Sequence, residues 1–253
     1  MMHTSPDPFI VASSNSYLII YKPPGLATAP LVKGEQYTLV SWCVTRFPEV
    51  GDVVGKKAIE GGLLHRLDTD TNGLVLFARN QAAYENLLEQ QAYGRILKQY
   101  RAWCQMWDAE KTLIGPGFPP PPVQLVPPLS QPLEVASLFR PYGPGRKQVR
   151  PVVSRTQKGL TLDHGQPYKT LIRSIEREEH ASTIYLLDVQ IERGFRHQIR
   201  CHLAWLGFPI VGDPLYNPRY SLGPCKHLLA LQAYGLEFLD PDTRQPVAYS
   251  LLL

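Results

Sequence analysis

The densest group of reactive side chains lies between His65 and Asp70, where a histidine, an arginine and two aspartates occur within six residues. Asn72 and Gly73 follow, and both residue types tolerate the positive φ values of a tight turn. Residues 74–78 are a short apolar run, which predicts a buried strand. The charged cluster is therefore expected on a tight loop at the mouth of a core strand, where a rigid scaffold can hold a catalytic group.

Two other interpretations fit the same loop. Asp68, Asp70, Asn72 and Gly73 match the first half of an EF-hand calcium loop. The twelfth position of such a loop would be Arg79, where calcium needs a bidentate glutamate, so calcium binding is disfavoured. The second interpretation is structural, with Asp68 as a turn residue paired to an arginine, and for an isolated Asp-x-Asp turn it would be the preferred one.

A second cluster, residues 194–207, combines arginines and histidines in a pattern that predicts a helix. Arg196 and Arg200 are four residues apart and share one side of that helix. His197 and His202 are five apart, not the four that separate two metal ligands on a helix, so no metal site is predicted. The N-terminus of such a helix favours a phosphate or a carboxylate.

The elements that must position these clusters can be recognised from periodicity and from breaker residues. The predicted helices are 38–47, which ends before Pro48, and 80–93, which Asn80 can cap. The predicted strands, besides 74–78, are 17–21, 96–106, 168–173 and 183–191. Lys98, Tyr100 and Ala102 share one side of the second of these strands, since side chains alternate along a strand. On this pattern alone, Tyr100 is an ordinary half-buried strand residue.

The segment 65–74 resembles the signature of the RluA-type pseudouridine synthases, which is His-Arg-Leu-Asp-x-x-Thr-x-Gly before an apolar strand. Four further segments resemble motifs of this family in the same order: 21–26 (Tyr-Lys-Pro-Pro-Gly-Leu), 98–100 (Lys-x-Tyr), 194–213 (Gly-x-x-His-Gln-Ile-Arg to Gly-x-Pro-Ile-x-Gly-Asp) and 231–238 (Leu-x-Ala-x-x-Leu-x-Phe). The chain departs from the family at Asn72, where the family has Ser, at Phe195-Arg196, where it has Arg-Thr, and at Gln232, where it has His. The resemblance covers residues from about 17 to about 240.

The resemblance implies a role for each matching residue. Asp68 would be the essential carboxylate, Tyr100 would lie against the target base or accept a proton, and Arg200 would be the ion-pair partner of Asp68. Arg66 would fill the space left by the flipped base or hold the RNA backbone. The residues expected to bind the substrate are His65, Arg66, Thr71, His197 and Gln198. No metal and no cofactor is implied, and the sequence contains no Gly-x-Gly-x-x-Gly motif and no P-loop.

The fold expected from the resemblance is α+β, with a mixed, mostly antiparallel central sheet, flanking helices and a catalytic cleft. A single catalytic domain is expected over residues 1–253, without a folded RNA-binding module of the S4 type before Tyr17. Residues 115–151 interrupt the pattern, because eleven of the 24 prolines lie there beside several basic residues. This segment is predicted to be a surface excursion that cannot pair as a central strand and is poorly ordered without RNA.

The excursion could be a linker, a polyproline ligand for a partner or a basic loop that touches RNA, and a domain boundary is the second interpretation. Its basic residues are Arg140, Arg146, Lys147 and Arg150. The net charge of +4 permits a polyanionic partner but does not require one. No segment has the apolar length of a membrane span or the pattern of a signal peptide.

The four cysteines are scattered and form no Cys-x-x-Cys pair, so neither a zinc site nor a disulfide framework is indicated, and a cytoplasmic location is expected. The sequence as a whole predicts a monomeric RNA pseudouridine synthase that acts on structured ribosomal or transfer RNA, without a membrane or a nucleotide cofactor. Two alternatives remain. One is a non-catalytic RNA-binding relative, and the other is a glycosidase that uses Asp68 and Asp70.

Overall fold

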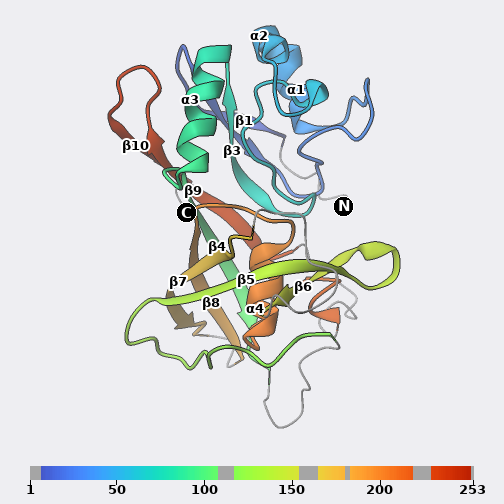
Figure 1. The fold of residues 1–253 in the computed structure, drawn as a ribbon, viewed down its shortest axis with the longest axis vertical. Coiled ribbons are helices and arrows are strands. Elements are labelled where there is room, and N and C mark those ends of the chain that lie inside the picture. The colour runs from blue at the N-terminus through green and yellow to red at the C-terminus, as the bar shows by residue number, and fades with distance from the viewer. Residues whose placement is uncertain (1–6, 108–116, 154–164, 180–182, 219–228, 252–253) are drawn as a thin grey trace. The chain divides into compact units, whose positions relative to one another are not determined.

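The computed structural model describes residues 7–107, 117–153, 165–179, 183–218 and 229–251 (Figure 1). Two compact units make up the chain. The first contains Met1–Gln99 and Gln232–Leu253, and the second contains Tyr100–Leu231. Strand β4 (Leu97–Gln105) begins in the first unit and continues in the second. The expectation of one catalytic domain over the whole chain stays a prediction.

The first unit is built on strands from both parts of its sequence. In order across the sheet they are β1 (Phe9–Ser13), β2 (Tyr17–Lys22), β3 (Asn72–Ala78), β9 (Leu231–Leu239) and β10 (Pro246–Ser250). Neighbouring strands are antiparallel, except that β3 and β9 run parallel. A parallel pair needs a long connection between its strands, and here that connection includes the whole of the second unit.

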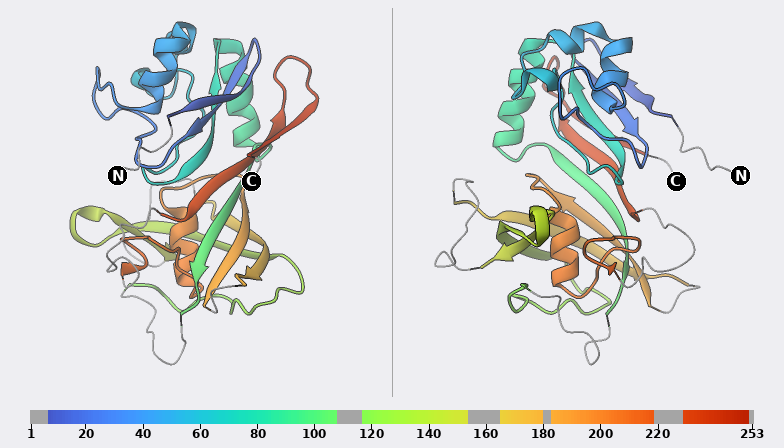
Figure 2. Two further views of the ribbon diagram at one scale, coloured as in Figure 1. Left: turned by 180° about the vertical axis from the view of Figure 1, so that it is seen from behind. Right: turned by 90° about the vertical axis from the view of Figure 1, so that its right-hand side faces the viewer.

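Short helices complete the first unit: α1 (Leu39–Arg46), α2 (Pro48–Asp52), the 3₁₀ helix η1 (Ala58–Glu60) and α3 (Gln81–Ala92). Thr38 and Ser41 form a capping box at the start of α1, and the Asn80 side chain accepts a hydrogen bond from the amide of Ala83 at the start of α3. Helix α3 packs against β3 (Figure 2). Tyr84 and Leu87 of α3 join the core that β2 and β3 supply.

The second unit is an antiparallel sheet with one helix. Its strands, in order, are β8 (Ile184–Ile191), β7 (Tyr168–Arg177), β5 (Leu133–Tyr142) and the edge strand β6 (Gln148–Val152). Helix α4 (Gln198–Trp205) packs against β6 and β7, and all eight of its residues are buried. A short 3₁₀ turn, η2 (Pro144–Arg146), joins β5 to β6.

Most of the predicted elements are confirmed, with ends that move by a few residues. The expected α+β fold with a mixed, mostly antiparallel sheet is also confirmed. The calcium interpretation is wrong, because Asn72–Ala78 form strand β3 where an EF-hand loop would continue. In addition, the guanidinium group of Arg79 binds Glu49, with Nε 2.8 Å from Oε1.

The statement that residues 115–151 cannot pair as a central strand is wrong for their second half. Strand β5 lies between β7 and β6 and pairs with both. The reason is the position of the prolines, most of which precede Leu133. Pro141 lies at the exposed end of β5, and Pro151 lies in β6, which is an edge strand where a missing N–H is tolerated.

Three cysteines, Cys43, Cys104 and Cys201, are buried and free, while Cys225 lies outside the described residues. Among the described residues, no helix has the length and apolar character needed to span a membrane.

Candidate active-site loop

The loop that carries Asp68 is tied to the polypeptide on both sides of this residue. The Thr28 hydroxyl donates to the carbonyl oxygen of Leu67 at 2.6 Å and accepts from the Leu67 amide at 3.1 Å. After Asp68, the carbonyl of Thr69 accepts from the amide of Gly25 at 2.9 Å. The Thr71 amide donates to the Asp68 carbonyl at 3.1 Å, which closes the turn. Asp68 itself is half-buried, so the backbone around its carboxylate is fixed while the side chain lies at the border with solvent.

Lys22, at the end of β2, holds this loop from inside. Its side chain is fully buried. The ammonium group donates to three carbonyl oxygens, those of Pro23 at 2.9 Å, Leu26 at 2.7 Å and Thr69 at 2.8 Å. Burial lowers the pKa of Lys22 to about 8, although the negative charges of Asp70 and Asp68 favour its protonated form. A buried cation therefore joins the loop after β2 to the loop before β3.

The end of the loop is fixed by a close approach of β3 to β9. Gly73 has a φ of +127°, and a Cβ at this position would lie 2.1 Å from the carbonyl oxygen of Ala233. Only glycine fits this contact. In the parallel pairing of β3 with β9, Asn72 lies opposite Gln232, just as Gly73 lies opposite Ala233. Two of the three places where the chain departs from the family pattern are therefore direct neighbours on adjacent strands.

His65 and Arg66 differ in their surroundings. The Nε2 atom of His65 accepts a hydrogen bond from the amide of Leu76 at 3.2 Å, which requires a neutral ring. Burial, together with the charge of Lys98, lowers the pKa of His65 to about 3. The Arg66 side chain is 45% exposed and lies 3.3 Å from Oε1 of Glu60. His65 thus fixes the loop to β3, and Arg66 lies at the solvent border of the loop; substrate binding by either residue stays a prediction.

Two more residues of the predicted site are buried. Thr71 is 2% exposed in the first unit, and Tyr100 is 6% exposed where β4 enters the second unit. The alternation along β4 buries Lys98, Tyr100 and Ala102, so the prediction that these residues share one side of a strand is confirmed. The roles expected for Thr71 and Tyr100 stay predictions.

Arg200, in α4, makes a buried two-point ion pair with Asp213. Its Nε lies 2.7 Å from Oδ2, and its Nη2 lies 2.8 Å from Oδ1. Asp213 also accepts hydrogen bonds from the amides of Leu215 and Tyr216, which hold its carboxylate in place. The spacing of residues along the sequence does not indicate this partner, although Asp213 ends the motif of residues 194–213. Asp213 uses two of the five N–H donors of the guanidinium group. The predicted pairing of Arg200 with Asp68 stays a prediction.

His197 and Gln198 begin α4 and are held by neighbouring elements of the second unit. His197 has a left-handed backbone conformation with φ +56°, and its Nδ1 lies 3.3 Å from the hydroxyl of Tyr216. Gln198 accepts from the amide of Phe195 at 2.9 Å and donates to the carbonyl of Lys169 at 2.9 Å. Because these contacts satisfy both ends of the amide, the structure gives Gln198 a positioning role, and substrate binding by these two residues stays a prediction.

His202 belongs to a buried polar network that the sequence did not reveal. Its Nε2 lies 2.9 Å from the hydroxyl of Ser137 in β5, and its Nδ1 lies 2.8 Å from the hydroxyl of Thr170 in β7. Burial lowers the pKa of His202 to about 3, so the ring is neutral at physiological pH. The network links α4 to β5 and β7 and so holds the second cluster, residues 194–207, in a fixed orientation.

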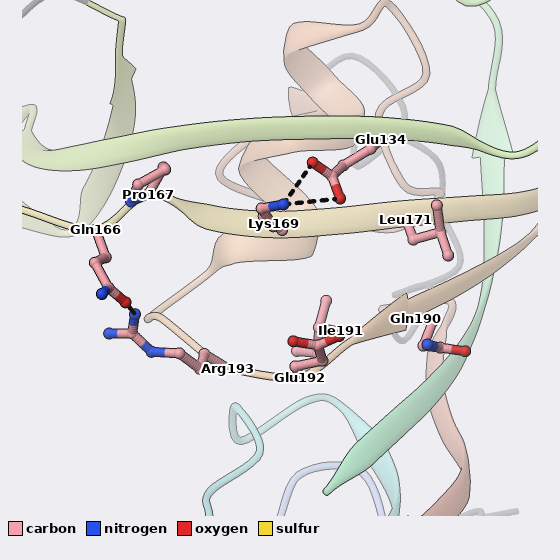
Figure 3. Close-up of a pocket in the computed structure, with 9 residues that line it drawn as sticks. All are labelled: Glu134, Gln166, Pro167, Lys169, Leu171, Gln190, Ile191, Glu192 and Arg193. Carbon is pink, nitrogen blue, oxygen red and sulfur yellow. Dashed lines mark hydrogen bonds and ion pairs between the residues drawn. The ribbon is translucent and has the colours of Figure 1, made fainter. Parts of the chain in front are cut away.

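A separate hollow of about 380 Å³ lies over β5, β7 and β8 (Figure 3). Its lining includes the ion pair between Lys169 and Glu134, with 3.1 Å between Nζ and Oε1, and the contact of Arg193 with Gln166. None of the predicted site residues lines this hollow. Opposite charges pair inside it, which leaves little net charge to attract an anion.

Comparison with known proteins agrees with the fold and the motifs. Residues 16–205 match the family described as RNA pseudouridylate synthase. An RNA pseudouridine synthase of Chloroflexus aurantiacus, described as uncharacterized, is 34% identical over 79% of this chain and 52% of its own length. The ribosomal large subunit pseudouridine synthase D of Pseudomonas aeruginosa is 28% identical over 85% of this chain and 55% of its own length.

Solved structures resemble the fold. The human RNA pseudouridylate synthase domain containing 1 superimposes with a TM-score of 0.66 at 19% identity, covering 98% of this chain and 84% of that protein. The chain belongs to the RNA pseudouridylate synthase family, and its resemblance to the RluA type is confirmed. It spans little more than half the length of the two bacterial relatives named above.

Proposed function

We propose that the chain is an enzyme that converts uridine in structured RNA to pseudouridine, with Asp68 as the catalytic carboxylate. The observation that carries the proposal is the fixation of the Asp68 loop. Thr28 binds the residue before Asp68, and Lys22 and Gly25 bind the residue after it. A reaction at one atom of a ribose needs such a preorganised carboxylate, because small displacements cost much of the rate.

The reaction breaks the bond between N1 of uracil and C1′ of the ribose, turns the base and rejoins it through C5. Asp68 would attack C1′ or remove a proton from C2′, and both routes need an ionised carboxylate. Lys22, a buried cation of the same unit, holds the carbonyl of Thr69 next to Asp68, and the negative charges of Asp70 and Asp68 favour its protonated form.

The remaining predicted residues act on the base and the strand. A uridine in folded RNA must leave its stack to be reached, which costs a few kcal/mol. Arg66 would stabilise the flipped state, Tyr100 would stack on the base or accept a proton, and Arg200 would balance the charge of Asp68. The names of the relatives favour ribosomal RNA as the substrate, and transfer RNA is the second candidate. A monomer in the cytoplasm is part of the proposal.

The test is release of tritium from C5 of uridine in transcribed ribosomal and transfer RNA. Asp68→Asn keeps the shape of the side chain and removes its charge, so we expect turnover to be abolished while RNA affinity is kept. Asp70→Asn is the matched control, because Asp70 lies two residues away on the same loop and is exposed. It is expected to retain most of the activity.

Other outcomes identify the alternatives. Substantial activity in Asp68→Asn would refute the assignment of the carboxylate. Release of free uracil, with equal losses in both variants, would favour a glycosidase. RNA binding without release of tritium from any RNA would favour a non-catalytic relative.

A further inference from the structure

The β5–β6 hairpin concentrates positive charge. Residues 138–152 contain four basic residues and no aspartate or glutamate. Two of these, Arg146 and Lys147, are exposed at the turn of the hairpin, which is the yellow-green loop in Figure 1. Within the described parts of the chain, neither side chain forms an ion pair with a carboxylate. The turn therefore presents two adjacent cations to solvent, and no carboxylate of the described residues is paired with either of them.

The backbone of this turn has a defined but unfavourable conformation. Gly143 and Gly145 have φ values of +77° and +63°, and Arg146, which is not a glycine, has a φ of +53°. A left-handed conformation is unfavourable for a residue with a Cβ, because the Cβ then lies too close to the following carbonyl oxygen. The Arg146 amide donates to the carbonyl of Gly143 at 3.0 Å, which closes the turn. A further contact must stabilise the side of the turn that follows Arg146.

Arg196 supplies that contact. Its Nη2 donates to the carbonyl of Arg146 at 2.7 Å and lies 3.2 Å from the carbonyl of Gln148. These two carbonyls flank Lys147, so one guanidinium group fixes the backbone on both sides of an exposed cation. Arg196 stands where the family has threonine, whose side chain has neither the length nor the N–H donors to bridge two carbonyls.

The base of the hairpin is fixed as well. Phe195 stacks on Phe139 of β5, with ring centroids 4.9 Å apart and planes at 5°, so the residue before Arg196 is anchored in the core. The guanidinium of Arg150 lies 4.1 Å from the ring centroid of Phe118 and 4.2 Å from that of Tyr142. The cations at the turn therefore stand on a rigid support.

We propose that the turn of residues 143–148 is a phosphate-binding surface for the RNA backbone, and that Arg196 is the positioning residue that fixes its conformation. The guanidinium of Arg146 can bind a phosphate through two N–H donors, and Lys147 adds a point charge beside it. Contacts of this kind position an RNA without reading its sequence. The choice of RNA as the polyanion rests on the proposed function.

The test measures how salt weakens the binding of a fluorescent RNA hairpin that lacks uridine, so that turnover cannot interfere. Arg146→Ser/Lys147→Ser in the full chain is expected to flatten the log–log dependence of affinity on salt, by roughly one unit per lost phosphate contact. The charge-matched control is Lys56→Ser/Arg95→Ser, which removes two exposed cations of the first unit. The control is expected to keep the slope of the wild type.

A double-mutant comparison tests the positioning role of Arg196. Arg196→Ala is expected to flatten the slope in the wild-type background and to change it no further when Arg146 and Lys147 are already serines. Hydrogen exchange at residues 143–148 is expected to become faster in Arg196→Ala. If Arg196→Ala flattens the slope by the same amount in the wild type and in Arg146→Ser/Lys147→Ser, Arg196 contacts RNA directly and the positioning role is refuted.

An unchanged slope in Arg146→Ser/Lys147→Ser would overturn the phosphate-binding surface. Failure of the proposed function gives a different result. The wild type would then release no tritium, while Arg146→Ser/Lys147→Ser would still show a flatter salt dependence of RNA binding than the wild type. Tritium release with an unchanged slope would refute the surface alone.

Discussion

Lys22→Met should remove the buried cation that joins the two loops. The change removes the Lys22 donor from three carbonyl oxygens. The oxygen of Thr69 keeps the amide of Gly25 as a donor, whereas those of Pro23 and Leu26 lose the ammonium group, and each unsatisfied buried group costs about 1–3 kcal/mol. The loss is offset in part, because the protein no longer has to bury a charge. We expect a net loss of about 2 kcal/mol in the free energy of unfolding at pH 7.5.

The pH dependence of this loss is a sharper test. Burial lowers the pKa of Lys22 to about 8 in the folded chain, whereas a lysine in an unfolded chain has a pKa of about 10.4. Between these values the unfolded chain binds more protons at Lys22 than the folded chain does, so this residue makes the wild type more stable as the pH rises. The advantage of the wild type over Lys22→Met should therefore grow by about 1.4 kcal/mol per pH unit above pH 8.

Urea unfolding followed by tryptophan fluorescence, at pH values from 7.5 to 10, measures both effects. Lys33→Met, which removes an exposed lysine, provides the reference for the pH dependence of the remaining chain. A difference between wild type and Lys22→Met that stays constant over this range would refute a buried lysine with a lowered pKa. A variant as stable as the wild type at pH 7.5 would refute the role of the three carbonyl contacts.

Two further predictions concern arginines. Arg200→Ala and Asp213→Asn should each destabilise the chain by about 3–5 kcal/mol, because each leaves a buried partner uncompensated; a lower urea midpoint would show this, and an Asp213→Asn variant with an unchanged midpoint would contradict it. Arg66→Ala should slow single-turnover modification of an RNA hairpin much more than that of its unfolded counterpart, since only the stacked uridine must be extruded. Equal losses on both RNAs would leave Arg66 as a general electrostatic contact.

The sequence predicted the elements well where local signals agree with burial. The apolar runs before Lys22 and after Gly73 became core strands, and Asn80 caps the helix that it was expected to cap. The expectation that residues 115–151 cannot pair as a central strand is wrong for their second half, because the effect of a proline depends on its position in the sheet and most of these prolines precede Leu133.

The candidate site shows which information a sequence lacks. Asp68 was found because its motif is local. The contacts of Lys22 and the pairing of Arg200 with Asp213 depend on which loops meet in space, and residue spacing does not give that. Lys22 could have been noticed as a lysine that ends an apolar strand before two prolines and a glycine, but its burial could not have been inferred.

The parallel pairing of β3 with β9 also sets the order in which the chain can mature. The residues that follow Asp68 on the loop reach their final contact only when Ala233 is available to Gly73. Contacts between residues so distant in sequence form slowly, and during synthesis they form late. The second unit is continuous in sequence, so it can fold on the ribosome before the first unit closes. A nascent chain whose strand β9 has not yet emerged from the ribosome would therefore carry Asp68 on a loop in which Gly73 has not yet made its contact with Ala233.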